Sequence, residues 1–326
     1  MKILLSGYYG FDNAGDEAIL SALVTEIKAL GHELTVLSSH PEKTARAHNV
    51  KAVSRTHPIA LFRAISSCNV MFSGGGGLLQ DKTSSRTLTY YLGLIGIALA
   101  LRKQVVVFNQ SIGPLSTEGQ KKVAKALQKT RNIVRDRGSL ALLESLGVQA
   151  ELGGDPALLL KTTKPQGSDE NTVVIAPRGG QRPATQKLAE VAHSLEGEGK
   201  KILLLAFQKE EDSSECKIIA ASCGKAEIVA LKDPQDALTH ISRAGLVIGV
   251  RLHAVILAAA VRVPFLGISY DPKVQGFCED AGAFSTGTDF EVNDLISRAL
   301  RVDSPDWKRV GEMKERAKRS FLRALE

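Results

Sequence analysis

Signatures of a bound metal are missing from this chain. It has four cysteines, which are Cys68, Cys216, Cys223 and Cys278. They form no C-x-x-C pair, and the seven histidines show no H-E-x-x-H or similar spacing. No zinc site is therefore indicated, and the cysteines are typical of reduced core thiols in a cytosolic protein.

The dinucleotide-binding fingerprint G-x-G-x-x-G is also missing after the first expected strand. The stretch there reads Gly7-Tyr-Tyr-Gly-Phe-Asp-Asn-Ala-Gly-Asp-Glu. The next expected strand ends in Leu37-Ser-Ser-His, without the acidic residue that would hold a ribose. Both absences disfavour a nicotinamide dinucleotide site.

Long apolar runs are few. The longest one, from Leu88 to Leu101, contains Thr89 and two glycines and falls short of the ~20 residues that span a bilayer. We expect a buried helix there and no membrane-crossing segment. The apolar run that starts at Met1 is too short for a signal peptide and predicts a first strand.

Aromatic residues make up 5% of the chain, and no aromatic platform or basic stripe of a nucleic-acid reader is visible. The formal net charge of +7 is a mild bias. It suits an anionic substrate or a membrane surface, and nucleic acid is not expected as a partner.

Expected strands and helices alternate along both halves. In the first half the pattern predicts strands at 2–6, 33–38, 70–73, 105–109 and 132–135, with helices at 16–30, 121–129 and 139–146. In the second half it predicts strands at 172–176, 201–206, 228–231, 244–250 and 264–268, with helices at 186–196, 216–222, 234–242 and 254–263. A polar stretch at 161–171 has linker composition. The prediction is an α/β protein with two Rossmann-like domains, 1–160 and 172–326, facing a cleft.

The most informative motif is Arg251-Leu252-His253. It follows the apolar run 244–250 and precedes the apolar run 254–263, so two basic side chains lie at the junction between an expected strand and an expected helix. A helix N-terminus favours anions. The motif therefore indicates an anion site that contains an acid–base group. The alternative is a surface arginine beside a neutral, hydrogen-bonded histidine.

Other basic residues also follow expected strands. Arg135, Arg137, Arg178 and Arg182 do so, and Lys273 follows the strand 264–268 within Ser269-Tyr-Asp-Pro-Lys. Ligands of open α/β sheets bind outside the carboxyl ends of the strands. The set predicts a ligand rich in carboxylate or phosphate. Solvated surface cations, and an Asp-Pro turn at Lys273, are the alternatives.

Two glycine-containing loops in the first half are candidates for the cleft. In the first, Gly7 allows a close backbone approach, and Asn13 is a plausible N-cap for the helix that follows. The second is Ser73-Gly-Gly-Gly-Gly-Leu-Leu-Gln-Asp-Lys. Its glycines, Gly75 and Gly76 among them, make room for a ligand or form a nest of N–H groups, and Gln80 and Asp81 are placed to bind hydroxyls. A structural turn and a flexible loop are the alternatives.

The C-terminal stretch places Trp307, Val310, Met313, Ala317 and Phe321 at helical spacing, with a basic opposite face. One interpretation is peripheral contact with anionic lipid. The other is a helix packed on the core with a solvated outer face.

Together these motifs resemble the polysaccharide pyruvyltransferases, and in particular the CsaB type of bacterial ketal-pyruvyltransferases. The resemblance is carried in order by Gly7-Tyr-Tyr-Gly-Phe, Gly15-Asp-Glu-Ala-Ile, the Gly74–Lys82 loop, Gln110-Ser-Ile-Gly-Pro, Arg135-Asp-Arg-Gly-Ser, Gly154-Asp-Pro-Ala, Arg251-Leu-His and Tyr270-Asp-Pro-Lys-Val. Gly77 departs from an expected serine, and Arg137 departs from an expected acidic residue.

The resemblance implies a fold similar to that of GT-B glycosyltransferases. It implies transfer of a pyruvyl group from phosphoenolpyruvate to two hydroxyls of a sugar, in CsaB-type enzymes a ManNAc residue of a lipid-linked cell-wall polymer precursor. It places the family's substrate-binding and catalytic motif on Arg251, Leu252 and His253, and its upstream arginine on Arg135. His253 would be the general acid and base, the two arginines would hold phosphate and carboxylate, and Arg178 and Lys273 are weaker candidates for these anions.

The scheme needs no metal or organic cofactor and fits a cytoplasmic enzyme, peripheral at the inner face of the cell membrane if the C-terminal helix meets lipid. The runner-up function is a GT-B-type glycosyltransferase or epimerase that uses a UDP-sugar. A non-enzymatic binding module ranks below it.

Overall fold

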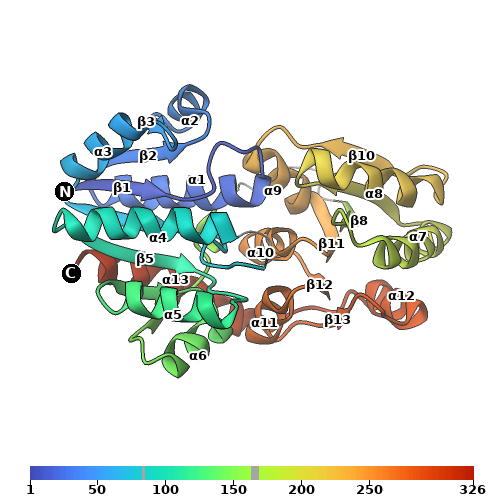
Figure 1. Cartoon of the computed structure of the whole chain (residues 1–326). Coiled ribbons are helices and arrows are strands. Elements are labelled where there is room, and N and C mark those ends of the chain that lie inside the picture. The colour runs from blue at the N-terminus through green and yellow to red at the C-terminus, as the bar shows by residue number, and fades with distance from the viewer. Residues whose placement is uncertain (83–84, 163–168) are drawn as a thin grey trace. The chain divides into compact units, whose positions relative to one another are not determined.

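The computed structural model describes residues 1–82, 85–162 and 169–326. Its contacts divide the chain into two compact units, each built around one parallel sheet (Figure 1). The first unit comprises Met1–Asp12, Ile19–Pro156 and Lys314–Glu326, and the second comprises Asn13–Ala18 and Ala157–Met313. The predicted fold class, two Rossmann-like α/β domains, is confirmed. Within the predicted linker, 163–168 lie outside the described residues.

The sheet of the first unit has the strand order β3-β2-β1-β4-β5-β6-β7, and its neighbouring strands pair in parallel. The strands are β1 Lys2–Ser6, β2 Glu33–Ser38, β3 Lys51–Ser54, β4 Val70–Gly74, β5 Gln104–Gln110, β6 Arg131–Val134 and β7 Glu151–Leu152. The chain moves outward from β1 to β3 and then returns to β4 on the other side of β1. Such a reversal is the point where open α/β sheets bind their ligands.

Helices connect these strands, as the right-handed crossovers of a parallel sheet require. They are α1 Ala14–Ala29, α2 Pro41–His48, α3 Pro58–Ser67, α4 Ser85–Ala100, α5 Thr117–Leu127 and α6 Arg137–Ser145. The helix expected from Leu88 to Leu101 is α4, but it buries one face only, with Leu88 and Leu94 buried and Ile97 40% exposed. No helix in the described ranges is long and apolar enough to cross a membrane.

The second unit repeats the same topology with the order β10-β9-β8-β11-β12-β13. Its strands are β8 Asp169–Ala176, β9 Lys201–Ala206, β10 Glu227–Ala230, β11 Ala244–Gly249, β12 Phe265–Ser269 and β13 Ser285–Gly287. Its helices are α7 Arg182–Gly197, α8 Lys209–Ala221, α9 Pro234–Arg243, α10 Leu252–Ala260, α11 Pro272–Ala281 and α12 Val292–Arg301, after a short 3₁₀ turn at Pro156–Leu159. Here the reversal lies between β8 and β11.

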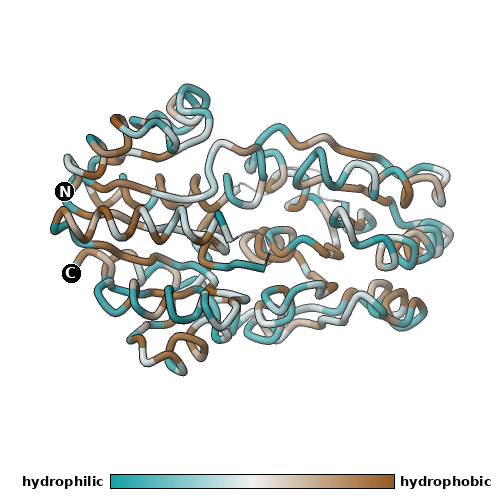
Figure 2. Tube along the Cα trace, viewed as in Figure 1, coloured by the Kyte–Doolittle hydropathy of each residue, from teal (hydrophilic) through white to brown (hydrophobic). Residues whose placement is uncertain are grey.

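Apolar strands form the core of each unit, and Figure 2 shows them as brown segments within the two sheets. In β1, Leu4 and Leu5 are fully buried, and in β11 Val247 and Ile248 are too. Strands covered on both faces are continuous apolar runs. This is why β1, β2 and β9 have the bounds that the sequence predicts.

The last helix, α13 Trp307–Leu325, belongs partly to each unit. Its Phe321 ring lies 4.8 Å from the Phe108 ring of β5, and Ser320 accepts a hydrogen bond from Asn109 at 2.8 Å. These contacts place residues 314–326 in the first unit, whereas the predicted division assigned the whole of 172–326 to the second. The apolar face is therefore packed on the core, as the second of the two interpretations predicts.

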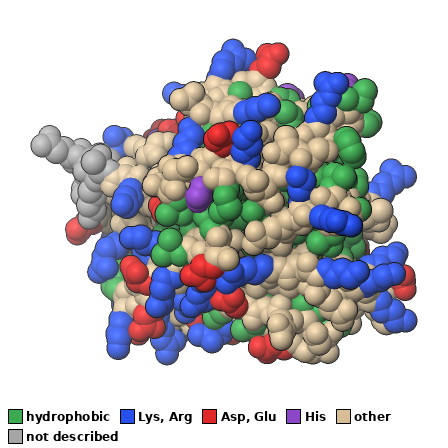
Figure 3. Space-filling model, turned by 90° about the vertical axis from the view of Figure 1, so that its left-hand side faces the viewer, with side chains coloured by type: hydrophobic (Ala, Val, Ile, Leu, Met, Phe, Trp, Pro, Cys, Tyr) green, Lys and Arg blue, Asp and Glu red, His purple; other side chains and the backbone are tan. Residues whose placement is uncertain are grey.

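Lys and Arg side chains do not form a continuous basic surface on the face drawn in Figure 3. Acidic side chains and apolar patches lie between them there. This mixed distribution fits the mild net charge of +7.

Candidate functional site

Arg251 stands where the sequence places it, between the end of β11 and the first turn of α10. Its backbone N–H donates to the Ala176 carbonyl at the end of β8, across the reversal point of the second sheet. The side chain is 9% exposed. A guanidinium buried to this extent needs compensating charge.

Asp212, in the first turn of α8, supplies most of that charge. Its carboxylate is fully buried. Arg251 donates to it through Nε, at 2.9 Å and 3.2 Å from the two oxygens, and through Nη2 at 2.5 Å. The Gly179 and Gln208 backbone N–H groups also donate to Asp212, at 3.0 Å and 2.9 Å. One carboxylate thus joins the loops that follow β8, β9 and β11.

Glu211 adds a second, half-exposed carboxylate, 2.9 Å from Nη2 of Arg251. Burial alone would lower the pKa of Arg251, but the hydrogen bonds and charges of Asp212 and Glu211 outweigh burial and raise it. This pairing modifies the prediction that Arg251 is an anion-binding cation. Its Nε and Nη2 atoms already donate to carboxylates, and Nη1 is the guanidinium nitrogen without a hydrogen-bond partner among the described residues.

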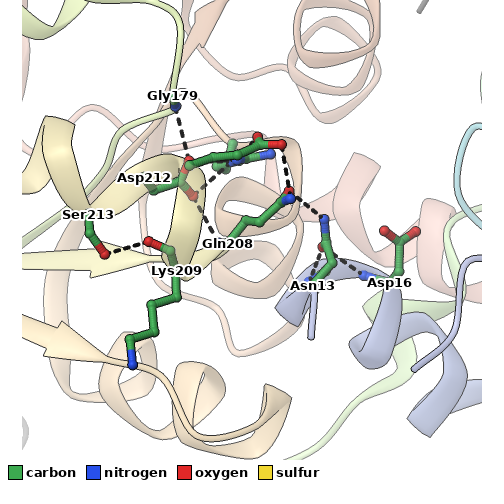
Figure 4. A network of polar contacts seen from close by, with 10 residues as sticks. Asn13, Asp16, Gly179, Gln208, Lys209, Asp212 and Ser213 are labelled. Atoms are coloured by element: carbon green, nitrogen blue, oxygen red, sulfur yellow. Dashed lines mark hydrogen bonds and ion pairs between the residues drawn. The ribbon is translucent and has the colours of Figure 1, made fainter. Parts of the chain in front are cut away.

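The network continues to the start of α1, which belongs to the second unit (Figure 4). Gln208 donates to Glu211 at 2.9 Å and accepts from Nδ2 of Asn13 at 3.3 Å. Oδ1 of Asn13 accepts the backbone N–H groups of Gly15 and Asp16. The prediction that Asn13 is an N-cap is confirmed, and its amide also anchors the cap to the network around Arg251.

His253 and Leu252 lie in the first turn of α10, and both are half-buried. The imidazole packs against Gly15, where a Cβ atom would come within 2.1 Å of Nδ1. The Nε2 atom is shielded from solvent. A glycine at position 15 is therefore what lets the ring occupy this place.

Arg178 follows β8, and Lys273 lies in the first turn of α11. The Arg178 guanidinium stacks on the Tyr270 ring, 4.3 Å from its centroid. No carboxylate lies within 4 Å of it in the described part of the chain. The Lys273 backbone N–H donates to Asp271, which caps α11. The second sheet therefore brings Arg178, Arg251, His253 and Lys273 to the carboxyl ends of three adjacent strands, β8, β11 and β12.

Arg135 follows β6 in the first unit, where it too is buried and paired. Nη1 donates to Asp155 at 2.7 Å, and Nε donates to the Ser111 hydroxyl at 2.7 Å. Asp155 is 3% exposed. The helix after Arg135 is capped by Asp136, which accepts the Ser139 N–H at 2.8 Å.

Gly7 and Gly75 of the first unit make room for neighbouring side chains. A Cβ at Gly7 would lie 2.2 Å from the Tyr9 ring, whose hydroxyl donates to the Gly74 carbonyl. Gly75 and Gly76 have φ of 75° and 69°. A Cβ at Gly75 would meet Ile19 at 2.2 Å, and its N–H donates to the Phe108 carbonyl. The Gly75 N–H is therefore not available to an anion nest, and the space beside Gly7 and Gly75 holds side chains of the protein.

The carboxylate of Asp81 is also engaged in hydrogen bonds within the protein. It accepts from the backbone N–H of Ser116 at 2.8 Å and from the Ser116 hydroxyl, and these bonds lower the pKa of Asp81. Ser116 is the N-cap of α5, so Asp81 anchors that helix, which differs from the predicted hydroxyl-binding role. Gln80, its half-buried neighbour, keeps that role as a prediction.

The buried acids are the residues that sequence reasoning missed. Glu210-Glu211-Asp212 is typical of the acidic first turn of a helix, and the predicted helix at 216–222 started beyond it. Asp155 lies within the Gly154-Asp-Pro-Ala motif, which carries no sequence sign of the contact with Arg135. A pair between residues so far apart in sequence leaves no local signal. No group of three or more His, Cys, Asp or Glu residues that could hold a metal occurs within residues 1–82, 85–162 and 169–326.

A family model described as polysaccharide pyruvyl transferase matches residues 13–272. The chain belongs to this family. The match includes the Arg135 and Arg251-Leu252-His253 motifs, and it supports an enzyme of this kind. No curated protein sequence matches the chain.

Several solved structures share the fold of this pyruvyl transferase family member. HepE of Anabaena, solved with UDP and glucose, has a TM-score of 0.67 at 11% identity, covering 100% of this chain and 99% of that chain. A putative UDP-N-acetylglucosamine 2-epimerase from Listeria monocytogenes has a TM-score of 0.65 at 12% identity, covering 99% and 97%. S. aureus MnaA, solved with UDP, has a TM-score of 0.65 at 10% identity, and the match covers 97% of this chain and 91% of that chain. At these identities the likeness establishes the GT-B-like fold alone.

Proposed function

We propose that this enzyme transfers a pyruvyl group from phosphoenolpyruvate to two hydroxyls of one sugar residue, forming a cyclic ketal and releasing phosphate. The observation that carries the proposal is the gathering of Arg178, Arg251, His253 and Lys273 at three adjacent strand ends in a family member. Phosphoenolpyruvate bears a carboxylate and a phosphate on a small frame, so its binding needs several cations close together.

The reaction balances without a redox step. A proton adds to the methylene carbon of phosphoenolpyruvate and makes C2 electrophilic. One sugar hydroxyl attacks C2, the bond from C2 to the phosphate oxygen breaks, and the second hydroxyl closes the ring. Of the two hydroxyl protons lost, one balances the proton now on the methyl carbon and the other leaves with the phosphate.

His253 is the proposed proton carrier in this scheme. It is the titratable side chain of the Arg251-Leu252-His253 motif whose ordinary pKa allows proton transfer near neutral pH. Gly15 fixes the ring from one side, and a fixed ring favours a defined proton path.

Arg251 would bind a substrate oxygen through Nη1, while Asp212 and Glu211 hold its other nitrogens in place. Two N–H groups engaged by carboxylates keep a guanidinium in one orientation. Arg178, which has a π partner in place of a carboxylate, retains more net charge for the phosphate or carboxylate. Arg135 is proposed as a further anion contact on the basis of the resemblance.

The proposed acceptor is ManNAc in a lipid-linked precursor of a cell-wall polysaccharide, and the proposed reaction uses no cofactor. Contact of α13 with anionic lipid would rest on its basic outer face and on Leu322, which is 57% exposed. Val310, Met313, Ala317 and Phe321 are all at most 5% exposed and already covered by protein.

The test is phosphate release from phosphoenolpyruvate across a panel of lipid-linked and analogue disaccharide acceptors, with and without EDTA. We expect release that depends on acceptor and survives EDTA. Thermal shift with phosphoenolpyruvate and with UDP runs in parallel, because a ligand that binds the folded state raises its apparent stability. Stabilisation by UDP alone, with no phosphate release, would favour the UDP-sugar enzyme.

A further inference from the structure

Arg55 occupies a place in the first unit that the proposed reaction does not use. It follows β3, and its backbone N–H donates to the Ser38 carbonyl at the end of β2. Its own carbonyl accepts the Tyr90 hydroxyl of α4 at 2.8 Å. Three elements thus hold this residue at the carboxyl ends of two adjacent strands.

Aromatic rings surround the Arg55 side chain. Its guanidinium carbon lies 4.5 Å from the Tyr90 ring centroid, 5.0 Å from that of Phe11 and 5.6 Å from that of Tyr91. Phe11 in turn stacks on Tyr8 at 4.0 Å, with 8° between the planes. We call Tyr8, Phe11, Arg55, Tyr90 and Tyr91 the Arg55 cluster. All five belong to the first unit.

This cation differs from Arg135 and Arg251 because no carboxylate lies within 4 Å of it in the described parts of the chain. Its Nη1 is buried and has no hydrogen-bond acceptor there. Ring faces attract the charge of a guanidinium, but they leave its in-plane N–H groups unsatisfied. Arg55 as a whole is half-buried, so the residue is partly open to solvent.

Phe11 adds an apolar face to this arrangement. Its side chain is one of the few large exposed hydrophobics, at 37%, although it rests flat on Tyr8. The exposed part of this ring offers an apolar surface beside a cation that no carboxylate within 4 Å compensates in the described residues. A sugar ring that carries an oxyanion has both complementary features, apolar C–H groups and negatively charged oxygens.

We propose that the Arg55 cluster is a binding subsite for an anionic sugar of the acceptor, with the oxyanion on the Arg55 guanidinium and the sugar ring against Phe11. The oxyanion is a phosphate ester or a sugar carboxylate, which a guanidinium recognises by the same paired N–H donors. The assignment to the acceptor rests on the proposed function.

The experiment is a calorimetric titration of the full chain without phosphoenolpyruvate. The probes are N-acetylmannosamine 1-phosphate, glucuronate, N-acetylmannosamine and inorganic phosphate. We expect N-acetylmannosamine 1-phosphate or glucuronate to bind at least tenfold more tightly than the neutral sugar and inorganic phosphate, and the tighter of the two identifies the oxyanion.

R55Q should weaken that binding by about ten- to a hundredfold, the range for loss of hydrogen bonds to a charged group. F11A should weaken it while leaving the weak binding of inorganic phosphate unchanged. R63Q is the matched control, because Arg63 is an exposed arginine of α3 with no ion pair among the described residues, and it should bind like the wild type. If circular dichroism shows R55Q unfolded, R55K takes its place, since it keeps the charge and loses the paired donors.

Equal binding by wild type and the Arg55 variant would overturn the subsite, and so would equal affinity of the wild type for neutral and anionic sugars. Phosphate release from phosphoenolpyruvate, measured separately, tests the proposed function. If R55Q loses binding of the anionic sugar and no protein releases phosphate, the subsite stands and the pyruvyl transfer is overturned. If phosphate is released and R55Q binds the anionic sugar like the wild type, the pyruvyl transfer stands and the subsite is overturned.

Discussion

Replacing Asp212 by asparagine tests the central claim about the second unit, that one buried carboxylate neutralises Arg251 and joins three loops. Breaking a buried ion pair by removing one partner costs about 3–5 kcal/mol. Glu211 remains 2.9 Å from Nη2 and still compensates part of the charge, so the low end applies. We expect the D212N variant to lose about 3 kcal/mol of unfolding free energy.

That loss corresponds to a midpoint lower by roughly 6–12 °C for a unit of this size. D212A should be worse than D212N, because the Gly179 and Gln208 N–H groups donate to different oxygens of Asp212, at 3.0 Å and 2.9 Å, and asparagine keeps one of these acceptors whereas alanine keeps neither. Each buried donor left unsatisfied costs about 1–3 kcal/mol.

The assay is urea unfolding followed by circular dichroism, with thermal melts beside it. E210Q is the matched control, since Glu210 is an exposed carboxylate in the same helix turn and its loss should change stability by at most about 0.5 kcal/mol. A D212N variant within about 1 kcal/mol of the wild type would refute the reasoning. Such a result would mean that the ion pair between Arg251 and Asp212 contributes no more to the unfolding free energy than an exposed ion pair does.

Three further predictions concern the site and its support. H253A should lower turnover by ~10²–10⁴-fold in the phosphate-release assay with an unchanged circular dichroism spectrum; near-wild-type turnover would remove His253 from the mechanism. G15A should lower turnover too, because its Cβ would lie 2.1 Å from Nδ1 of His253 and displace the ring. In the H253A background the same change should cost less stability than in the wild type, because the ring is gone and only the Cβ of residue 253, 3.0 Å away, remains in contact; an equal loss in both backgrounds would show that the ring is not what position 15 accommodates. The folded-state pKa of Asp81 is lowered, so its stabilising bonds to Ser116 are present above the unfolded pKa of about 3.9 and are lost as pH falls through the folded value. Wild type and D81N should therefore differ by about 1 kcal/mol at pH 7 and converge only once the pH has fallen through the lowered folded-state pKa of Asp81, as measured by urea unfolding; a difference that persists in stronger acid would contradict this.

Local sequence determined the framework of the fold. The strands β1, β2 and β9 have the predicted bounds because buried parallel strands are continuous apolar runs. The sequence pattern predicts no element in the region 41–67, although this region holds α2, β3 and α3. β3 lies at the edge of its sheet and buries none of its residues fully, so it leaves no apolar run to detect.

In the candidate site, too, local sequence predicts some features and leaves others to the tertiary structure. The sequence alone placed Arg251 and His253 at a strand-to-helix junction and Asn13 at a helix cap, because those signals lie within a few residues of one another. Only the tertiary structure decided that Arg251 is paired with Asp212, that Arg135 is paired with Asp155, and that Gly15 makes room for His253. The two arginine–aspartate pairs are brought together by the order of strands in each sheet, and a buried charge is governed by what lies beside it in space.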